Sequence, residues 1–129
     1  MGKRKLIFIV DDDPVVTMMI VKRFTSENYT LEAFNYGEEC IKALSKKPDL
    51  IILDYYFFKP GETVMNGMEV FDKIKEVNSG VPIIMLSGQE RGELVLELAR
   101  KGIDDYVIKD NNLIDNLNAS ILELMSREN

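Results

Sequence analysis

Short apolar segments alternate along the chain with longer segments in which apolar residues recur every three or four positions. Residues 6–10, 50–53 and 81–86 are almost wholly apolar and rich in β-branched side chains, which is typical of buried parallel strands. Residues 29–34 alternate more and residues 105–108 are short, so these two segments predict strands nearer the edges of the same sheet. The pattern therefore predicts five strands.

A helical segment follows each predicted strand. Residues 14–26 should form a helix with Asp13 as its N-cap, and residues 38–46 should form a second. In the first helix we expect one apolar stripe, formed by Val15, Met18, Met19 and Phe24. The other three helices are predicted from apolar residues at helical spacing: Val70, Ile74 and Val77; Leu94, Val95 and Leu98; and Leu113, Leu117, Ile121 and Leu124.

Five strands that alternate with five helices predict an α/β fold of the (βα)5 type. Such a chain forms a doubly wound parallel sheet with helices on both faces, because the crossover connections are right-handed. The chain contains no internal repeat and no linker, so we expect residues 1–129 to be one domain. Ligands of such folds bind at the carboxyl ends of the strands, which makes the residues found there the first candidates for function.

Polar residues follow four of the five predicted strands. In chain order they are Asp11, Asp12 and Asp13, then Asp54, Ser87 and Lys109. Three carboxylates that meet at one edge of a sheet repel one another and raise one another's pKa unless a cation keeps them ionised. Mg²⁺ suits such a site, because it takes one or two protein carboxylates, keeps several waters and reserves a position for a phosphate oxygen.

The same residues indicate phosphoryl transfer. Lys109 would supply a second positive charge, since this chemistry depends mainly on positioning and charge neutralisation. Ser87 would add a hydroxyl donor, and Asp54 is the carboxylate best placed to accept a phosphoryl group covalently. Each residue alone has an ordinary structural explanation, as a turn residue, a helix cap or a solvated lysine. Their combination at one edge favours a functional site.

Composition narrows the chemistry further. The chain holds 22 acidic and 16 basic residues, a net charge of −6, which argues against a dedicated binder of nucleic-acid backbones. It has no histidine and a single cysteine, Cys40, which excludes histidine-based triads, the usual zinc sites and an internal disulfide. No apolar stretch approaches the ~20 residues of a membrane helix. The run 6–10 is also too short for a signal core, so we expect a cytoplasmic protein with no membrane partner.

Five segments, taken in order, resemble the successive signatures of the receiver domain of two-component response regulators. They are residues 10–14 (VDDDP), 48–54 (PDLIILD), 66–69 (NGME), 82–88 (PIIMLSG) and 102–109 (GIDDYVIK). The resemblance covers nearly the whole chain. It implies a flavodoxin-like sheet with the strand order 2-1-3-4-5, and a phosphoacceptor signalling domain rather than an enzyme.

The resemblance also implies a set of ligands and a partner. Asp54 would be the phosphoacceptor, taking its phosphoryl group from the phosphohistidine of a histidine kinase or histidine phosphotransfer protein. Asp12 and Asp54 would bind Mg²⁺ directly, Asp11 would act through the waters of the metal, and the backbone carbonyl of Tyr56 would complete the ligands. Because the chain has no histidine, it would be the aspartate half of such a relay.

Ser87 and Tyr106 are implied to form the switch. The serine hydroxyl would bond the phosphoryl group, the tyrosine ring would turn inward, and the surface of the fourth helix, fifth strand and fifth helix would change for a downstream protein or output domain. Tyr56 and Gln89 occupy positions that resemble gates for the water that hydrolyses the phosphoryl group. If Tyr56 shields the phosphoryl group from water, we expect slow loss of phosphate.

The chain departs from the family pattern in two places. The segment between Asp54 and Gly67 is roughly five residues longer than usual, and long loops in compact domains are functional or disordered. Its apolar run, residues 55–58, is expected to pack against the domain rather than to form a docking surface. Asp110 stands where the family usually has proline, which leaves the placement of Lys109 open.

Two other functions stay open. A small phosphatase could use Asp54 as a turnover nucleophile, but it would need a substrate pocket for which the sequence offers no cap. A degenerate receiver could act only as a protein-interaction module, and the inserted loop keeps that alternative open.

Overall fold

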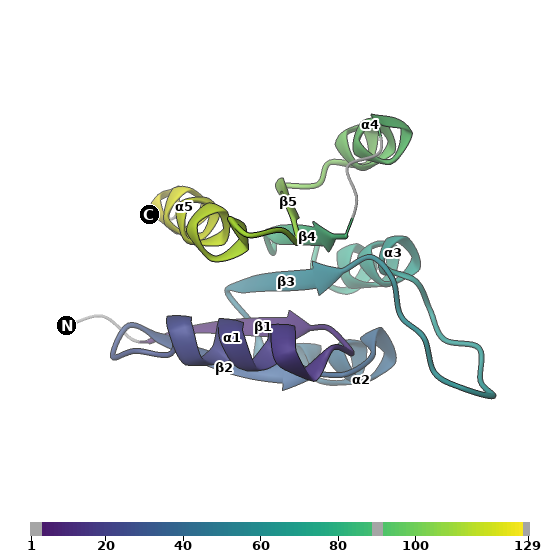
Figure 1. Ribbon diagram of the computed structural model, residues 1–129, viewed down its shortest axis with the longest axis horizontal. Coiled ribbons are helices and arrows are strands. Elements are labelled where there is room, and N and C mark those ends of the chain that lie inside the picture. Colours follow the sequence, from purple (N-terminus) through teal and green to yellow (C-terminus); the bar gives the residue numbers. More distant parts are fainter. Residues whose placement is uncertain (1–3, 89–91, 128–129) are drawn as a thin grey trace.

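The computed structural model describes residues 4–88 and 92–127 of the 129-residue chain. Its centre is a sheet of five parallel strands: β1 (Lys5–Val10), β2 (Tyr29–Phe34), β3 (Leu50–Asp54), β4 (Ile83–Ser87) and β5 (Asp105–Ile108). The strand order is β2-β1-β3-β4-β5, so the predicted fold class and order are confirmed (Figure 1). The order reverses between β1 and β3, which is where ligands of this fold class bind.

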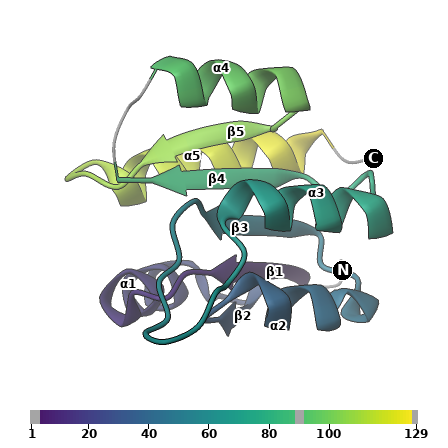
Figure 2. The ribbon, with the colours of Figure 1, turned by 90° about the vertical axis from the view of Figure 1, so that its right-hand side faces the viewer.

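In the described residues, four α-helices and one 3₁₀ turn lie between the strands, and a fifth α-helix follows β5. They are α1 (Pro14–Phe24), α2 (Gly37–Lys42), the 3₁₀ turn (Leu44–Lys46), α3 (Gly67–Val77), α4 (Gly92–Lys101) and α5 (Leu113–Ser126). Figure 2 shows α2 and α3 in front of the sheet and α5 behind it. None of the described helices is long and apolar enough to cross a membrane.

The core has two layers, one on each face of the sheet, and residues of β1 contribute to both. Phe8 and Val10 point into one cluster, which they share with apolar residues of α2, α3 and α4. Ile7 and Ile9 point into the other cluster, with apolar residues of α1 and α5. Successive residues of a strand face opposite sides, so a strand covered by helices on both faces must be apolar throughout. This explains why β1, β3 and β4 are recognisable from sequence.

The predicted stripe of α1 is wrong for three of its four residues. Val15, Met18 and Met19 are 58%, 60% and 43% exposed, whereas Ile20 and Phe24 are the buried residues of this helix. Seven of the eight residues from position 14 to 21 are apolar, so spacing alone does not distinguish one face of the helix from the next. Ile20 and Phe24, four positions apart, form the stripe that contacts the sheet.

Candidate functional site

The carboxyl ends of β1 and β3 bring three aspartates together. Asp11 and Asp12 follow the last residue of β1, and Asp54 is the last residue of β3. Val10 pairs with Leu53 in the sheet, so the two strands end at the same level. One carboxylate oxygen from each aspartate lies within 4.8 Å of those of the other two. Asp11 and Asp54 are buried, and Asp12 is partly exposed.

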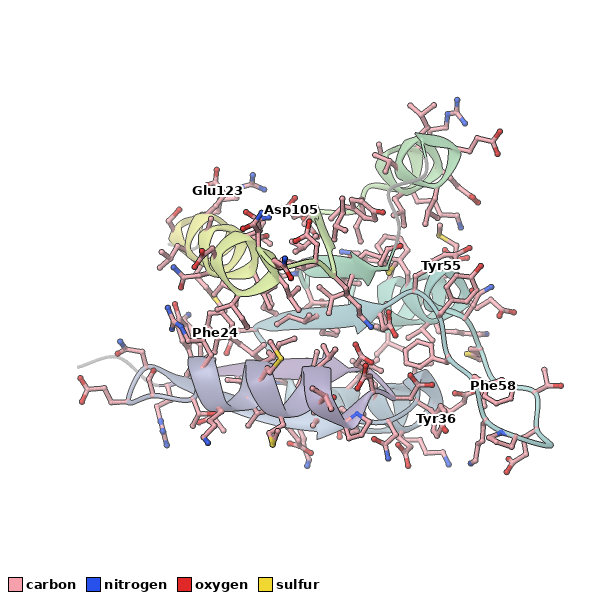
Figure 3. All side chains as sticks on the ribbon, viewed as in Figure 1. Phe24, Tyr36, Tyr55, Phe58, Asp105 and Glu123 are labelled. Atoms are coloured by element: carbon pink, nitrogen blue, oxygen red, sulfur yellow. The ribbon has the colours of Figure 1, made fainter. Side chains whose placement is uncertain are left out.

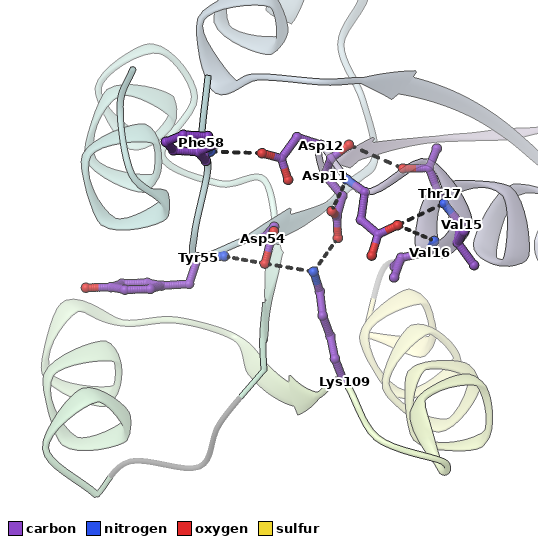
Figure 4. Close-up of polar contacts among 10 residues, drawn as sticks. Asp11, Asp12, Val15, Val16, Thr17, Asp54, Tyr55, Phe58 and Lys109 are labelled. Carbon is purple, nitrogen blue, oxygen red and sulfur yellow. Dashed lines mark hydrogen bonds and ion pairs between the residues drawn. The ribbon is translucent and has the colours of Figure 1, made fainter. Parts of the chain in front are cut away.

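Lys109, directly after β5, reaches into this group. Its Nζ atom lies 2.7 Å from Asp11 Oδ2 and 3.1 Å from Asp54 Oδ1 (Figure 4). The Lys109 backbone N–H donates to the Ser87 carbonyl at 2.8 Å, which keeps the chain in register with β4 as it leaves the sheet. Every peptide bond of the described residues is trans, so Asp110 in place of proline does not prevent Lys109 from reaching the aspartates.

Short local hydrogen bonds fix Asp11 and Asp54. Asp11 Oδ1 accepts the Asp13 backbone N–H at 2.8 Å, and Asp54 Oδ1 accepts the Tyr55 backbone N–H at 2.9 Å. Asp13 does not face the group. Its carboxylate caps α1 by accepting the Val15 N–H at 2.9 Å, as the sequence predicted. Neighbouring residues of one acidic run therefore have different structural roles.

Burial and charge shift the pKa values at this edge. Burial, and then repulsion from Asp11, raise the pKa of Asp54 to about 7, although Lys109 opposes the rise. Burial also raises the pKa of Asp11, against the attraction of Lys109. Burial by itself would lower the pKa of Lys109, but its contacts with Asp11 and Asp54 outweigh that effect and raise the pKa. The site holds more negative charge than one ammonium group neutralises.

The donor set fits a hard divalent cation. Asp11 Oδ2 is buried, and its partner is the Lys109 ammonium group, 2.7 Å away. One ammonium group offsets one negative charge, and an oxygen-binding divalent cation would offset the charge that is left. Three carboxylates with ligand atoms within 4.8 Å of one another also supply the oxygen donors that such a cation prefers.

Ser87 and Tyr106 lie on the neighbouring strands. Ser87 is the buried last residue of β4, at the same edge of the sheet as Asp54, which pairs with Leu86. Tyr106 is partly buried on β5, opposite Met85, and its ring packs against the cluster on the α2–α4 side. Ser87 therefore lies at the edge that holds the aspartates, and Tyr106 lies on the neighbouring strand. Gln89, the other proposed gate residue, lies outside the described residues.

The long segment after β3 projects from the carboxyl edge of the sheet (Figure 1). Tyr55 and Phe57 are partly buried and pack against the core, as predicted for the apolar run. For Tyr56 and Phe58 the prediction is wrong, since they are 65% and 75% exposed. The residues alternate between inward and outward positions because this stretch is extended, and an extended chain presents successive side chains to opposite sides.

Two features next to the site were not predicted. The Phe58 backbone N–H donates to Asp12 Oδ2 at 2.9 Å, which connects the inserted segment to the aspartates. A Cβ atom on Gly67 would lie 2.5 Å from the Asp54 carbonyl oxygen, so only glycine fits at the start of α3. The dipeptide Pro60-Gly61 was a signal for a turn in this segment, but no sequence pattern marks a backbone contact with Asp12.

Comparison with known proteins identifies the family. The family model of the response regulator receiver domain matches residues 7–121. This chain belongs to the receiver domain family. It is 35% identical over 108 residues to the DNA-binding response regulator MtrA of Mycolicibacterium smegmatis, covering 82% of this chain and 44% of that protein. It is 29% identical over 104 residues to the transcriptional regulatory protein GlrR of Escherichia coli, covering 80% of this chain and 22% of that protein.

Solved response regulators share the fold. The response regulator DrrB of Thermotoga maritima superposes with a TM-score of 0.82 at 25% identity, covering 96% of this chain and 54% of that one. The response regulator TrrA of the same organism was solved in complex with Mg²⁺ and BeF. It superposes with a TM-score of 0.77 at 29% identity, covering 93% of this chain and 98% of that one. This receiver domain spans less than half the length of MtrA, so the remaining part of that protein has no counterpart among the aligned residues.

Proposed function

We propose that this receiver domain is phosphorylated on Asp54 by a partner phosphohistidine, carried by a histidine kinase or a histidine phosphotransfer protein. The observation that carries the proposal is the Asp54 carboxylate itself. It is buried at the switch point of the sheet, with two carboxylates on one side and the Lys109 ammonium group 3.1 Å away. No other arrangement among the described residues combines a nucleophilic carboxylate with charges of both signs in this way.

Mg²⁺ is the cofactor that these residues would hold. Asp12 and Asp54 would bind it directly, Asp11 would act through its waters, and the Tyr56 backbone carbonyl would add a neutral oxygen. When bound, the ion neutralises negative charge on the acceptor carboxylate and on the incoming phosphoryl group. The related TrrA, solved with Mg²⁺ and BeF, supports this assignment.

The chain's own residues then perform the transfer. An oxygen of ionised Asp54 forms the bond to phosphorus while the bond between phosphorus and the donor's histidine nitrogen breaks, and the nitrogen keeps the electron pair. Lys109 neutralises charge on the phosphoryl oxygens, in the position that it already holds beside Asp54. Ionisation of Asp54 matters because its pKa, about 7 without metal, leaves it partly protonated at neutral pH.

Ser87 and Tyr106 would convert phosphorylation into a change of surface. The Ser87 hydroxyl, at the end of β4, would bond the phosphoryl group, and the Tyr106 ring would turn inward from β5. The surface of α4, β5 and α5 would then be read by a downstream protein or an output domain. This role is regulatory, so we propose a domain that promotes only its own phosphorylation and dephosphorylation and that acts in the cytoplasm without direct contact to nucleic acid or membrane.

Phosphorylation is tested by intact-mass spectrometry. The purified chain is incubated with Mg²⁺ and a small acyl phosphate, and its mass is compared with that of Asp54→Asn treated in the same way. We expect the mass of one phosphoryl group to be added to the wild type and not to the variant. An absent adduct would refute Asp54 as the acceptor and favour an interaction module without phosphorylation. An equal adduct on the variant would also refute Asp54, because the phosphoryl group would then be on another residue.

A further inference from the structure

The inserted segment contacts the site through one backbone group. The Phe58 N–H donates to Asp12 Oδ2 at 2.9 Å, across 46 positions of sequence. Figure 4 shows the Asp12 carboxylate between the Phe58 amide and the carboxylates of Asp11 and Asp54. One oxygen of Asp12 therefore accepts a hydrogen bond from the inserted segment, and the other oxygen lies on the side of Asp11 and Asp54. A hydrogen bond from a neutral amide to a carboxylate is strong enough to fix the rotation of the carboxylate.

The amide is itself held in place by a turn. Residues 59–62 form a β-turn in which the Glu62 N–H donates to the Lys59 carbonyl at 3.1 Å, and an ion pair of 3.5 Å joins the same two side chains. Gly61 has a φ of 76°, the left-handed conformation that a glycine after proline supplies in such turns. The two arms next to the turn are thereby kept together.

The segment is also attached to the N-cap and first turn of α2. The Tyr36 hydroxyl donates to the Phe58 carbonyl at 3.3 Å, and the Lys59 ammonium group lies 5.1 Å from the centre of the Tyr36 ring. Glu38 Oε2 accepts the Met65 N–H at 2.9 Å further along. Figure 3 shows Tyr36 beside the segment that carries Phe58. Contacts at Phe58, Lys59 and Met65 thus hold the segment against α2 and its N-cap, next to the Phe58 N–H.

We infer that the Phe58 backbone amide is a positioning group for the metal ligand Asp12. The inserted segment holds one oxygen of this partly exposed carboxylate, so that the other is already oriented toward Asp11 and Asp54 before metal binds. A carboxylate oriented in advance loses less rotational freedom on binding, and the affinity for the cation rises accordingly. This inference rests on the proposed binding of Mg²⁺ by Asp12.

The test measures Mg²⁺ affinity by isothermal titration calorimetry on the full chain. Phe58→Pro removes the N–H, and Phe58→Ala keeps it while removing the exposed ring. We expect the proline variant to bind Mg²⁺ roughly threefold to tenfold more weakly and the alanine variant to stay within about twofold of wild type. The unfolding temperature of each variant in EDTA shows whether the domain remains intact. Equal or tighter binding by an intact proline variant would overturn the inference.

A second measurement uses the wild type and so does not depend on the proline variant folding. Hydrogen exchange of the Phe58 amide is followed by NMR with and without saturating Mg²⁺. If the amide positions Asp12, its protection persists when Mg²⁺ is bound. Faster exchange on Mg²⁺ binding would mean that metal and amide compete for the carboxylate, and would overturn the inference. If the wild type bound no Mg²⁺ at all, both the proposed metal site and the inference about Phe58 would be refuted. The mass experiment on Asp54 tests the phosphoacceptor separately.

Discussion

Lys109 Nζ lies 3.1 Å from Asp54 Oδ1, although Lys109 follows the edge strand β5 and Asp54 ends the central strand β3. The long side chain of the lysine crosses the end of β4 to make this contact. The two residues therefore influence one another's protonation, and the strength of that influence is measurable.

Substitution of Lys109 by methionine should raise the pKa of Asp54 above its metal-free value of about 7. The lysine lowers that pKa both through its charge and through its hydrogen bond, so removing it leaves burial and Asp11 unopposed. The shift is measured by carboxyl ¹³C NMR titration in EDTA. Lys101→Met is a matched control, because Lys101 pairs with Asp72 at 2.8 Å on other elements and should leave Asp54 unchanged. An unchanged titration midpoint in Lys109→Met would contradict the assigned contact.

Asp54→Asn should stabilise the metal-free protein at high pH. Because the pKa of Asp54 is higher in the folded chain, about 7, than its ordinary 3.8, the folded state binds the proton more tightly. The part of the unfolding free energy that comes from protonated Asp54 is fully present below about pH 4 and is lost as the pH rises through 7. Asparagine does not titrate, so the variant does not lose it. The difference amounts to at most about 4 kcal/mol.

Urea unfolding of wild type and Asp54→Asn at pH 5 and pH 8 in EDTA measures this difference. The other titrating groups are common to both proteins and largely cancel. We expect the advantage of the variant to grow between the two pH values and to shrink when Mg²⁺ is added. A constant difference at both pH values would show that Asp54 does not titrate in this range.

Gly67→Ala should destabilise the domain and disturb the acceptor. The added Cβ would lie 2.5 Å from the Asp54 carbonyl oxygen and 2.6 Å from the Tyr55 Cα, and both are backbone atoms that must move. We expect a loss of roughly 1–3 kcal/mol in urea unfolding, with slower phosphorylation by acyl phosphate. Gly92→Ala serves as the control, since its Cβ would meet nothing within 4 Å. Similar stabilities for the two variants would argue against a close approach at Gly67.

Cys40 should be unreactive in the native protein. Its side chain is fully buried on α2, and burial raises the pKa of the thiol to about 12, so almost no reactive thiolate is present at neutral pH. A colorimetric disulfide reagent should therefore react slowly in buffer and rapidly in urea, with one equivalent of thiol released. Fast reaction in buffer would indicate that α2 opens readily from the sheet.

The grouping of residues at the strand ends was predictable because it follows from the direction of the strands alone. Parallel strands end at one edge, so residues as distant in sequence as Asp11 and Asp54 had to meet there. The exposed stripe of α1 was not predictable, because apolar residues occupy almost the whole first half of that helix. The contact between Phe58 and Asp12 was also beyond the sequence, since it uses a backbone group whose direction depends on a loop conformation. Every residue except proline has the same backbone N–H, so the sequence does not show which N–H will bind a carboxylate.

The cap of α1 has a consequence for the dynamics of the site. Asp13 accepts hydrogen bonds from Val15 and Val16, while its own N–H is held by Asp11. The first turn of the helix and the buried aspartate thus share one residue. Fraying of that turn would release Asp11 as well, so the opening of α1 and the loss of an ordered acidic site become a single local unfolding event.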